Sequence, residues 1–175
     1  MTSKFQVVSE KPKSSLLLHV EKMSQMTLTI EDASIRHLDR LYEIEMECFE
    51  REAFTKQQIA HLLTDYNSVS LIAKLNGEIV GFIIGMVYIE RNSLIGHILT
   101  IDVSPIQRQK GIAQKLLHEI EKIFKGKTVK ACHLEVKEDN IAALSLYQKL
   151  GYKKIARLKN YYGNAHGIYL KKYLT

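Results

Sequence analysis

Cysteine is scarce in this chain of 175 residues, and its scarcity excludes several classes of protein. The two cysteines, Cys48 and Cys132, are too few for a disulfide scaffold and match no metal-ligand spacing. This usage fits a reducing compartment, so we expect a cytoplasmic protein that binds no metal. We also expect both thiols to be buried as small hydrophobic side chains.

Long hydrophobic runs are missing as well. The longest mostly apolar stretch covers residues 79–89, whereas a membrane helix needs about 20 apolar residues. The leucines at 16–18 form an apolar piece far shorter than the roughly 7–15 residues of a secretory signal. We therefore expect no membrane segment and no signal peptide, and residues 79–89 are predicted to form a buried strand.

Acidic residues are fewer than basic ones, which gives a net charge of +6 and much basic character after Lys149. Solvated strand and helix faces and a nucleic-acid-binding patch both fit this charge. No arginine-rich run or aromatic platform accompanies it, so we expect no specific nucleic-acid partner.

The composition, 46% hydrophobic and 25% charged without an internal repeat, is typical of one soluble domain. Residues 1–25 are polar, show no sustained period, and are predicted to be an N-terminal arm or a short added element. The compact domain is predicted to span 26–175. Met23 and Met26 leave open that the compact domain simply begins there.

Hydrophobic periods and turn residues predict the order β-α-α-β-β-β-α-β-α-β-β. Asp32 and Ser34 supply N-cap chemistry for the first helix, Thr55 for the second, and Asn76-Gly77 predicts a tight hairpin. The predicted strands are 28–30, 69–73, 79–89, 98–103, 130–136, 152–161 and 165–173. Residues 91–96 are predicted to turn the chain into the fourth strand, and the later helices are predicted to end at Gly126 and Gly151. This order predicts a mixed α/β domain in which helices flank a largely antiparallel sheet.

One motif lies where the central predicted strand passes into a helix. Arg108, Gly111 and Ala113 form R-x-x-G-x-A at the helix N-terminus, where unpaired backbone N–H groups and the helix dipole favour a diphosphate. The spacing is neither a P-loop nor G-x-G-x-x-G. Alone, the motif fits a tight strand-to-helix turn equally well.

A second motif follows in residues 134–152, L-E-V-K-E-D-N-I-A-A-L-S-L-Y-Q-K-L-G-Y. It places Glu135 on a strand, Asn140 at a helix start and Tyr147 two turns along that helix. Together with R-x-x-G-x-A and the later N-Y-Y, it resembles the GNAT superfamily of N-acetyltransferases over about residues 28–174. Within that superfamily it is similar to the branch that acetylates protein N-termini, the ribosomal-alanine and archaeal Ard types.

This resemblance implies the GNAT fold and acetyl-CoA as cosubstrate. The turn 108–114 would hold the pyrophosphate, and the strand 99–103 would pair with the pantetheine. Asn140 would hydrogen-bond the cofactor's arm, a role compatible with a plain N-cap. The implied cofactor-binding residues are Leu99, Ile101, Asp102, Val103, Arg108, Gln109, Lys110, Gly111, Ile112, Ala113, Gln114, Asn140 and Tyr147.

The resemblance also implies catalytic roles, because acyl transfer needs a neutral amine. Glu135 matches the family's base, and His97 matches a position that helps through an ordered water; which of them is the main base stays open. Tyr147 matches the acid that serves the leaving thiolate, with a core aromatic as the alternative. A backbone N–H near Val103 would meet the oxyanion.

The implied acceptors are protein or peptide N-termini, ribosomal proteins among them. Tyr161 and Tyr162 would line the peptide groove, opposite a loop containing Glu50 and Phe54, with edge tyrosines as the alternative. The chain departs from the family at Asp102, where a small residue is usual, and ends its motif in Ala113 in place of a second glycine.

Two other functions remain open at this point. An acetyltransferase for lysine side chains or small amines would share the cofactor turn and differ at the acceptor groove. A non-catalytic module that binds CoA or nucleic acid would not need Glu135 and Tyr147. The oligomeric state is not indicated by the sequence.

Overall fold

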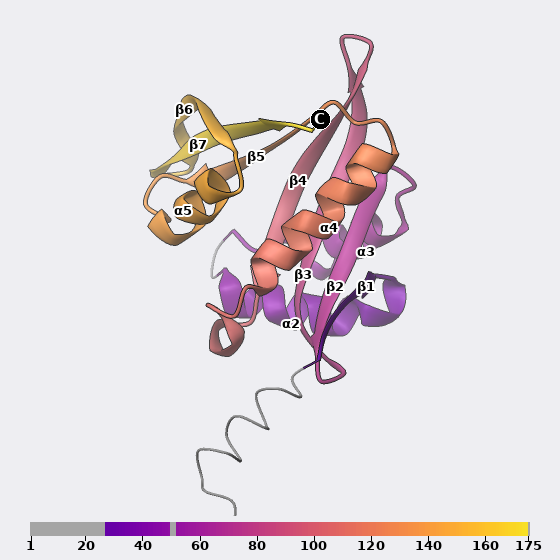
Figure 1. Ribbon diagram of the computed structural model, residues 1–175. Coiled ribbons are helices and arrows are strands. Elements are labelled where there is room, and N and C mark those ends of the chain that lie inside the picture. The colour runs from indigo at the N-terminus through magenta and orange to yellow at the C-terminus, as the bar shows by residue number, and fades with distance from the viewer. Residues whose placement is uncertain (1–26, 50–51, 175) are drawn as a thin grey trace, which may run out of the picture.

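The computed structural model describes residues 27–49 and 52–174. The predicted arm at 1–25, the outermost residues of the predicted domain 26–175 and the candidate acceptor residue Glu50 lie outside the described residues. The described chain forms one seven-stranded sheet with helices on both faces (Figure 1). None of its helices has the length and apolar character to cross a membrane.

The predicted order of elements is confirmed, with two short 3-10 helices added. The elements are β1 (Leu28–Asp32), η1 (Ile35–His37), α2 (Leu38–Cys48), α3 (Lys56–Thr64), β2 (Ser68–Leu75), β3 (Glu78–Glu90), β4 (Ser93–Val103), η2 (Pro105–Gln107), α4 (Ile112–Gly126), β5 (Ala131–Lys137), α5 (Ile141–Lys149), β6 (Lys153–Tyr162) and β7 (Ala165–Tyr173). The strand order across the sheet is β1-β2-β3-β4-β5-β7-β6. Among the strands of the described residues only the β4–β5 pair is parallel, so the predicted largely antiparallel sheet is confirmed.

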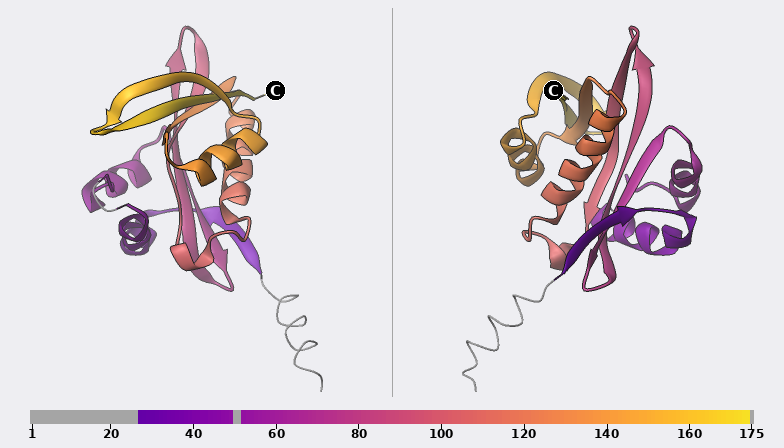
Figure 2. Two further views of the ribbon diagram at one scale, coloured as in Figure 1. Left: turned by 90° about the vertical axis from the view of Figure 1, so that its left-hand side faces the viewer. Right: turned by 45° about the vertical axis from the view of Figure 1, so that its right-hand side comes forward.

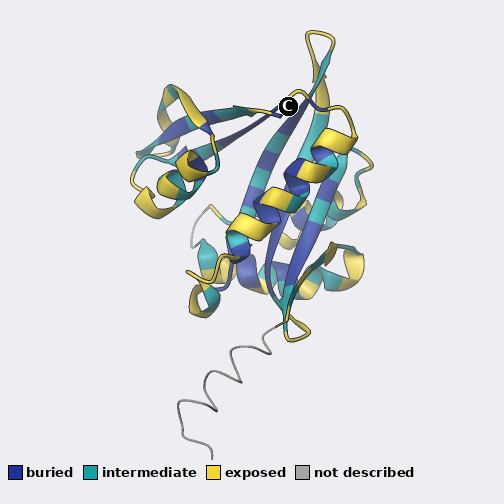
Figure 3. Cartoon of the chain, viewed as in Figure 1, coloured by how far each residue is buried: buried dark blue, intermediate teal, exposed yellow. Residues whose placement is uncertain are grey.

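Two hydrophobic cores lie on opposite faces of the sheet. Helix α4 packs on one face, whereas α2 and α3 cover the other (Figure 2). The apolar residues of α4 recur every three or four positions and lie on its inner side, while the outer side stays exposed (Figure 3). They are Ile112, Leu116, Leu117, Ile120 and Phe124. The second core gathers around Leu41, Ile44, Ile59 and Phe82.

Most strand boundaries differ from the predicted ones by one or two residues, and the predictions for the turn before β4 and the end of α4 are wrong. Strand β4 begins at Ser93, because the turn uses only Arg91 and Asn92, whose φ angles of 47° and 62° fit a two-residue hairpin. Helix α4 retains Gly126, and Thr128 takes the left-handed conformation instead, with φ 63°. The hairpin at Asn76-Gly77 is confirmed, with φ angles of 53° and 88°.

The sheet opens between its two parallel strands. Strands β4 and β5 are paired only at Ile95–Ala131, Gly96–Cys132 and His97–His133. Beyond these pairs β5 turns away from β4 together with β7 and β6 (Figure 1). In the same region the β3–β4 register shifts past Leu99, which is a bulge in β4. The edge of β4 from 98 to 103 therefore faces β5 without a ladder, and an extended ligand chain can pair with it.

Candidate functional site

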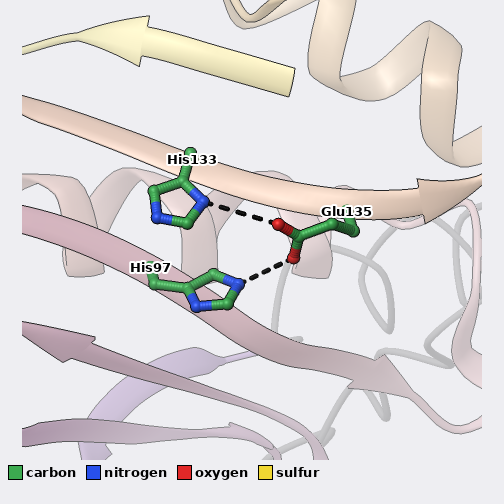
Figure 4. Close-up of side chains that lie close together, drawn as sticks. All are labelled: His97, His133 and Glu135. Carbon is green, nitrogen blue, oxygen red and sulfur yellow. Dashed lines mark hydrogen bonds and ion pairs between the residues drawn. The ribbon is translucent and has the colours of Figure 1, made fainter. Parts of the chain in front are cut away.

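The fork between β4 and β5 brings two of the predicted catalytic residues into contact. His97 is the last paired residue of β4, and Glu135 lies two residues beyond His133 on β5, so both point to the same face of the sheet. The His97 Nε2 atom lies 2.7 Å from the Glu135 Oε2 atom (Figure 4). Residues 97 and 135 thus form one hydrogen-bonded unit.

The electrostatics of this unit keep Glu135 ionised. Burial raises the pKa of its carboxyl, but the close approach of His133, together with the hydrogen bond and charge of His97, outweighs burial and lowers it to about 2. A carboxylate with so low a pKa is a weak proton acceptor by itself. It is well suited to orient His97 and to stabilise an imidazolium.

His133 is a residue of this site that the sequence reasoning missed. Its ring stacks on that of His97, with centroids 4.2 Å apart and planes at 20°. Its Nδ1 atom lies 3.7 Å from Glu135 Oε1, and its Nε2 atom hydrogen-bonds the Tyr88 hydroxyl. The signal was available, because residues two apart on a strand share a face.

Tyr147 lies in the core beside the fork. It is on α5, only 5% exposed, with its ring centroid 5.6 Å from that of Tyr152. Burial, followed by the charges of Asp102 and Tyr162, raises the pKa of its hydroxyl well above the usual value. The hydroxyl therefore stays protonated at neutral pH and can act as a hydrogen-bond donor.

The predicted phosphate turn has two residues with positive φ directly before α4. Gln109 and Gly111 have φ angles of 62° and 76°, and α4 begins directly after Gly111 without a side-chain cap. The first backbone N–H groups of α4 therefore have no intrahelical partner. A Cβ atom added at Gly111 would meet nothing within 4 Å, so the space before the helix is open.

The side chains of the other predicted cofactor residues lie in different surroundings, from the core to the surface of the turn. Arg108 Nε donates to the Val103 carbonyl at 3.1 Å, which ties the turn to the end of β4. Asn140 caps α5, since its Oδ1 accepts from the Ala143 N–H at 3.1 Å. Ile112, the first residue of α4, is buried, and Leu99 occupies the β4 bulge. Ile101 and Val103 pack toward the α4 core, and Lys110 hydrogen-bonds Gln107.

Asp102 occupies a buried carboxylate pair. Its side chain points toward α2, where it is 2% exposed, beside Glu45, which is 1% exposed. The Thr100 hydroxyl lies 2.8 Å from the Asp102 carboxylate and 3.4 Å from that of Glu45. Burial and the Glu45 charge raise the pKa of Asp102 well above its usual value. The unusual acid in this strand is thus explained by a partner on α2.

Cys132 is buried as predicted, but the same prediction is wrong for Cys48, which is only half-buried. The Cys48 thiol lies 3.4 Å from the Val103 carbonyl and 3.4 Å from the Arg108 guanidinium. Cys48 therefore belongs to the contacts at the end of β4.

Of the predicted acceptor residues, Tyr161 and Tyr162 lie at the end of β6, whereas Phe54 packs with the α2–α3 core. Lys137 Nζ forms an ion pair with Glu52 at 2.8 Å and lies 5.8 Å from the ring centroid of Tyr162. Tyr161 packs edge-on against Tyr162 and is 52% exposed. The Phe54 N–H donates to Glu45 at 2.8 Å. The segment 52–54 and the β6–β7 hairpin are thus connected through Lys137.

The fold and this fork define a mixed α/β domain with a candidate catalytic pair at the opening of its sheet, and comparison with known proteins gives its family. The Acetyltransferase (GNAT) family matches residues 38–152. The N-alpha-acetyltransferase of Saccharolobus solfataricus is 30% identical over 159 residues, covering 86% of this chain and 95% of that protein. The chain belongs to the GNAT acetyltransferase family.

More distant relatives agree with this assignment. The N-terminal acetyltransferase B catalytic subunit NAA20 of Arabidopsis thaliana is 28% identical over 144 residues, covering 73% of this chain and 82% of that protein. Two solved structures share the fold: the Escherichia coli ribosomal-protein-S18-alanine N-acetyltransferase (TM-score 0.77, 22% identity, 85% and 95% coverage) and Thermoplasma volcanium Ard1 (TM-score 0.77, 24% identity, 85% and 98% coverage).

Proposed function

We propose that this protein transfers the acetyl group of acetyl-CoA to the α-amino group of protein N-termini, by direct attack in a ternary complex. The observation that carries the proposal is the His97–Glu135 unit at the mouth of the β4–β5 fork, beside an unpaired strand edge. Relatives named N-alpha-acetyltransferase, matched over most of this chain, support the choice of acceptor.

The described residues fit acetyl-CoA as the acetyl donor. The donor supplies a thioester, an acyl group already activated for attack by an amine. The unpaired edge of β4 from 98 to 103 suits the amide groups of a pantetheine chain, and the first N–H groups of α4 suit a diphosphate. Solved structures with the same fold contain acetyl-CoA or CoA, which supports this choice.

The first chemical task of the protein is to remove a proton from the incoming ammonium group. An α-ammonium with a pKa of about 8 carries no lone pair for attack. His97 accepts the proton, directly or through a water, while the Glu135 carboxylate orients the imidazole and stabilises its positive charge. A positioned base of this kind contributes roughly 10²–10⁴-fold in rate.

The second task is to stabilise the charge that develops on the donor side. A backbone N–H near Val103, at the open edge of β4, is the proposed donor to the oxyanion. Tyr147 remains protonated because its pKa is raised, and we assign its hydroxyl to donate to the departing sulfur.

The acceptor would bind between segment 52–54 and the β6–β7 hairpin. Tyr161 and Tyr162 offer aromatic and hydroxyl contacts to a short extended peptide, and Lys137 holds both sides of this region together. A lysine ε-amine or a small amine is the alternative acceptor, because the same base would serve it.

A pair of peptides tests this proposal. One carries a free N-terminus and an internal lysine, and the other has the same sequence with its N-terminus blocked. We expect acetyl-CoA-dependent addition of one acetyl group to the free peptide, located on its first residue by fragmentation mass spectrometry, and no addition to the blocked peptide. Equal acetylation of both peptides on lysine would contradict the proposed acceptor.

A further inference from the structure

Three side chains at the fork lie close enough together that they could hold a metal ion. His97, His133 and Glu135 each offer one such atom, and these atoms all lie within 4.8 Å of one another (Figure 4). Two imidazoles and one carboxylate are the protein ligands of many zinc sites that leave a fourth position open. No cysteine takes part, and His97 comes from a different strand, so no sequence spacing signals the site.

His133 has a buried ring nitrogen that lacks a partner in the described part of the chain. The side chain is only 6% exposed, and among the described residues its Nδ1 atom has no hydrogen-bond partner. This atom faces Glu135 Oε1 at 3.7 Å, a separation too long for a hydrogen bond. In a tetrahedral zinc site with bonds of about 2.0–2.2 Å, ligand atoms lie roughly 3.3–3.6 Å apart. A zinc ion between these two atoms would satisfy both.

The surroundings of His133 fit the second shell of such a site. Zinc-bound histidines usually hydrogen-bond a further group through the other ring nitrogen, which fixes the ring. Here His133 Nε2 hydrogen-bonds the hydroxyl of Tyr88, which directs Nδ1 toward Glu135. The stacked His97 ring, at 20° to that of His133, presents Nε2 to the other oxygen of the same carboxylate at 2.7 Å.

We propose that His97, His133 and Glu135 form a binding site for Zn²⁺, and that its occupation inhibits acetyl transfer. The inhibitory part rests on the proposed function, because zinc bound to His97 and Glu135 would replace the hydrogen bond that orients the imidazole for proton transfer. It would also place positive charge beside the ammonium group that must lose a proton. Mg²⁺ should not replace zinc, since it prefers six oxygen ligands in octahedral geometry.

Binding is tested by calorimetry on the full chain after treatment with a chelator. Titration with zinc chloride should give one strong site per chain, and magnesium chloride should give none. His133→Phe keeps an aromatic ring against His97 and should weaken zinc binding at least tenfold. Tyr88→Phe, which loses only the outer hydrogen bond, should weaken it by about 10–100-fold. His118→Ala, at an exposed position on α4, is the matched control and should bind zinc like the wild type.

Melting temperatures show whether each variant is folded. If His133→Phe does not fold, Tyr88→Phe still decides the question. The site is refuted if the wild type binds no zinc, or if folded His133→Phe and Tyr88→Phe bind it as tightly as the wild type.

Inhibition is tested by initial rates of peptide acetylation with and without zinc, each variant being compared with its own zinc-free rate. We expect zinc to abolish wild-type activity, a chelator to restore it, and Tyr88→Phe to need a higher zinc concentration. Activation by zinc, or no effect at a concentration that fills the site, would overturn the inhibitory role. If the protein binds zinc through His133 but never acetylates a free N-terminus, the metal site stands and the proposed function fails.

Discussion

The effect of an alanine at Gly111 separates the role of the phosphate turn from its contribution to stability. Gly111 has a φ angle of 76°, and an added Cβ atom meets nothing within 4 Å. Gly111→Ala therefore costs only the strain of a left-handed alanine, about 1–2 kcal/mol. In a domain of this size, that strain lowers the melting temperature by roughly 2–8 °C. The protein should remain folded.

The same Cβ atom would lie in the open space where we place the diphosphate. It would push the ligand away from the first N–H groups of α4. A hydrogen bond to a charged group contributes about 1.5–3 kcal/mol, so the loss of one should weaken acetyl-CoA binding roughly 10–100-fold.

Gly163→Ala is the matched control for this experiment. Gly163 has a φ angle of 66°, also has open space around its missing Cβ, and lies in the β6–β7 turn. It should lose similar stability and keep the wild-type dissociation constant for acetyl-CoA. Calorimetric titration of both folded variants with acetyl-CoA decides the matter. Unchanged affinity in Gly111→Ala would refute the assignment of this turn.

Three further predictions concern the core, the acid and the acceptor region. The pKa of Asp102 is raised in the folded protein, so its contribution to stability falls as the pH rises from about 4 through that raised pKa. Asp102→Asn should therefore raise the melting temperature at pH 7 and have little effect at pH 4. A lower melting temperature at pH 7 would contradict this. Tyr147→Phe should fold normally but reduce kcat by roughly 10²–10⁴-fold at saturating substrates, whereas undiminished turnover would exclude Tyr147 as the acid. Lys137→Ala removes the ion pair with Glu52 and should raise KM for the peptide several-fold without changing acetyl-CoA affinity. An unchanged KM would show that this ion pair does not contribute to acceptor binding.

Local patterns in the sequence were sufficient to predict the elements. The apolar residues of α4 recur at helical spacing, Thr55 accepts from the Gln58 N–H as a helix cap, and Asn76-Gly77 forms the predicted hairpin. Each of these features depends on residues close together in the chain. The end of α4 was mispredicted because Thr128, a residue type that rarely has positive φ, took the position expected of a glycine.

Features that depend on distant residues could not be read from these patterns. Asp102 could be recognised as unusual, but its partner Glu45 is on α2, more than fifty residues earlier. The β4–β5 fork depends on where two strands stop pairing, and nothing in the local sequence of either strand specifies that point. His133 shares a strand face with Glu135, but its contact with His97 depends on the pairing of β4 with β5, which the sequence of neither strand specifies.

The most direct test of the account is a double-mutant cycle at the fork, with kcat measured at saturating acetyl-CoA and a peptide with a free N-terminus. Because His97 and Glu135 are joined by a 2.7 Å hydrogen bond, we expect them to act as one base. Glu135→Gln and His97→Ala should each lose roughly 10²–10⁴-fold, the double variant should lose little more than the worse single variant, and all three should bind acetyl-CoA normally. Losses that multiply, or a double variant with wild-type kcat, would contradict the claim that this pair removes the proton from the amine.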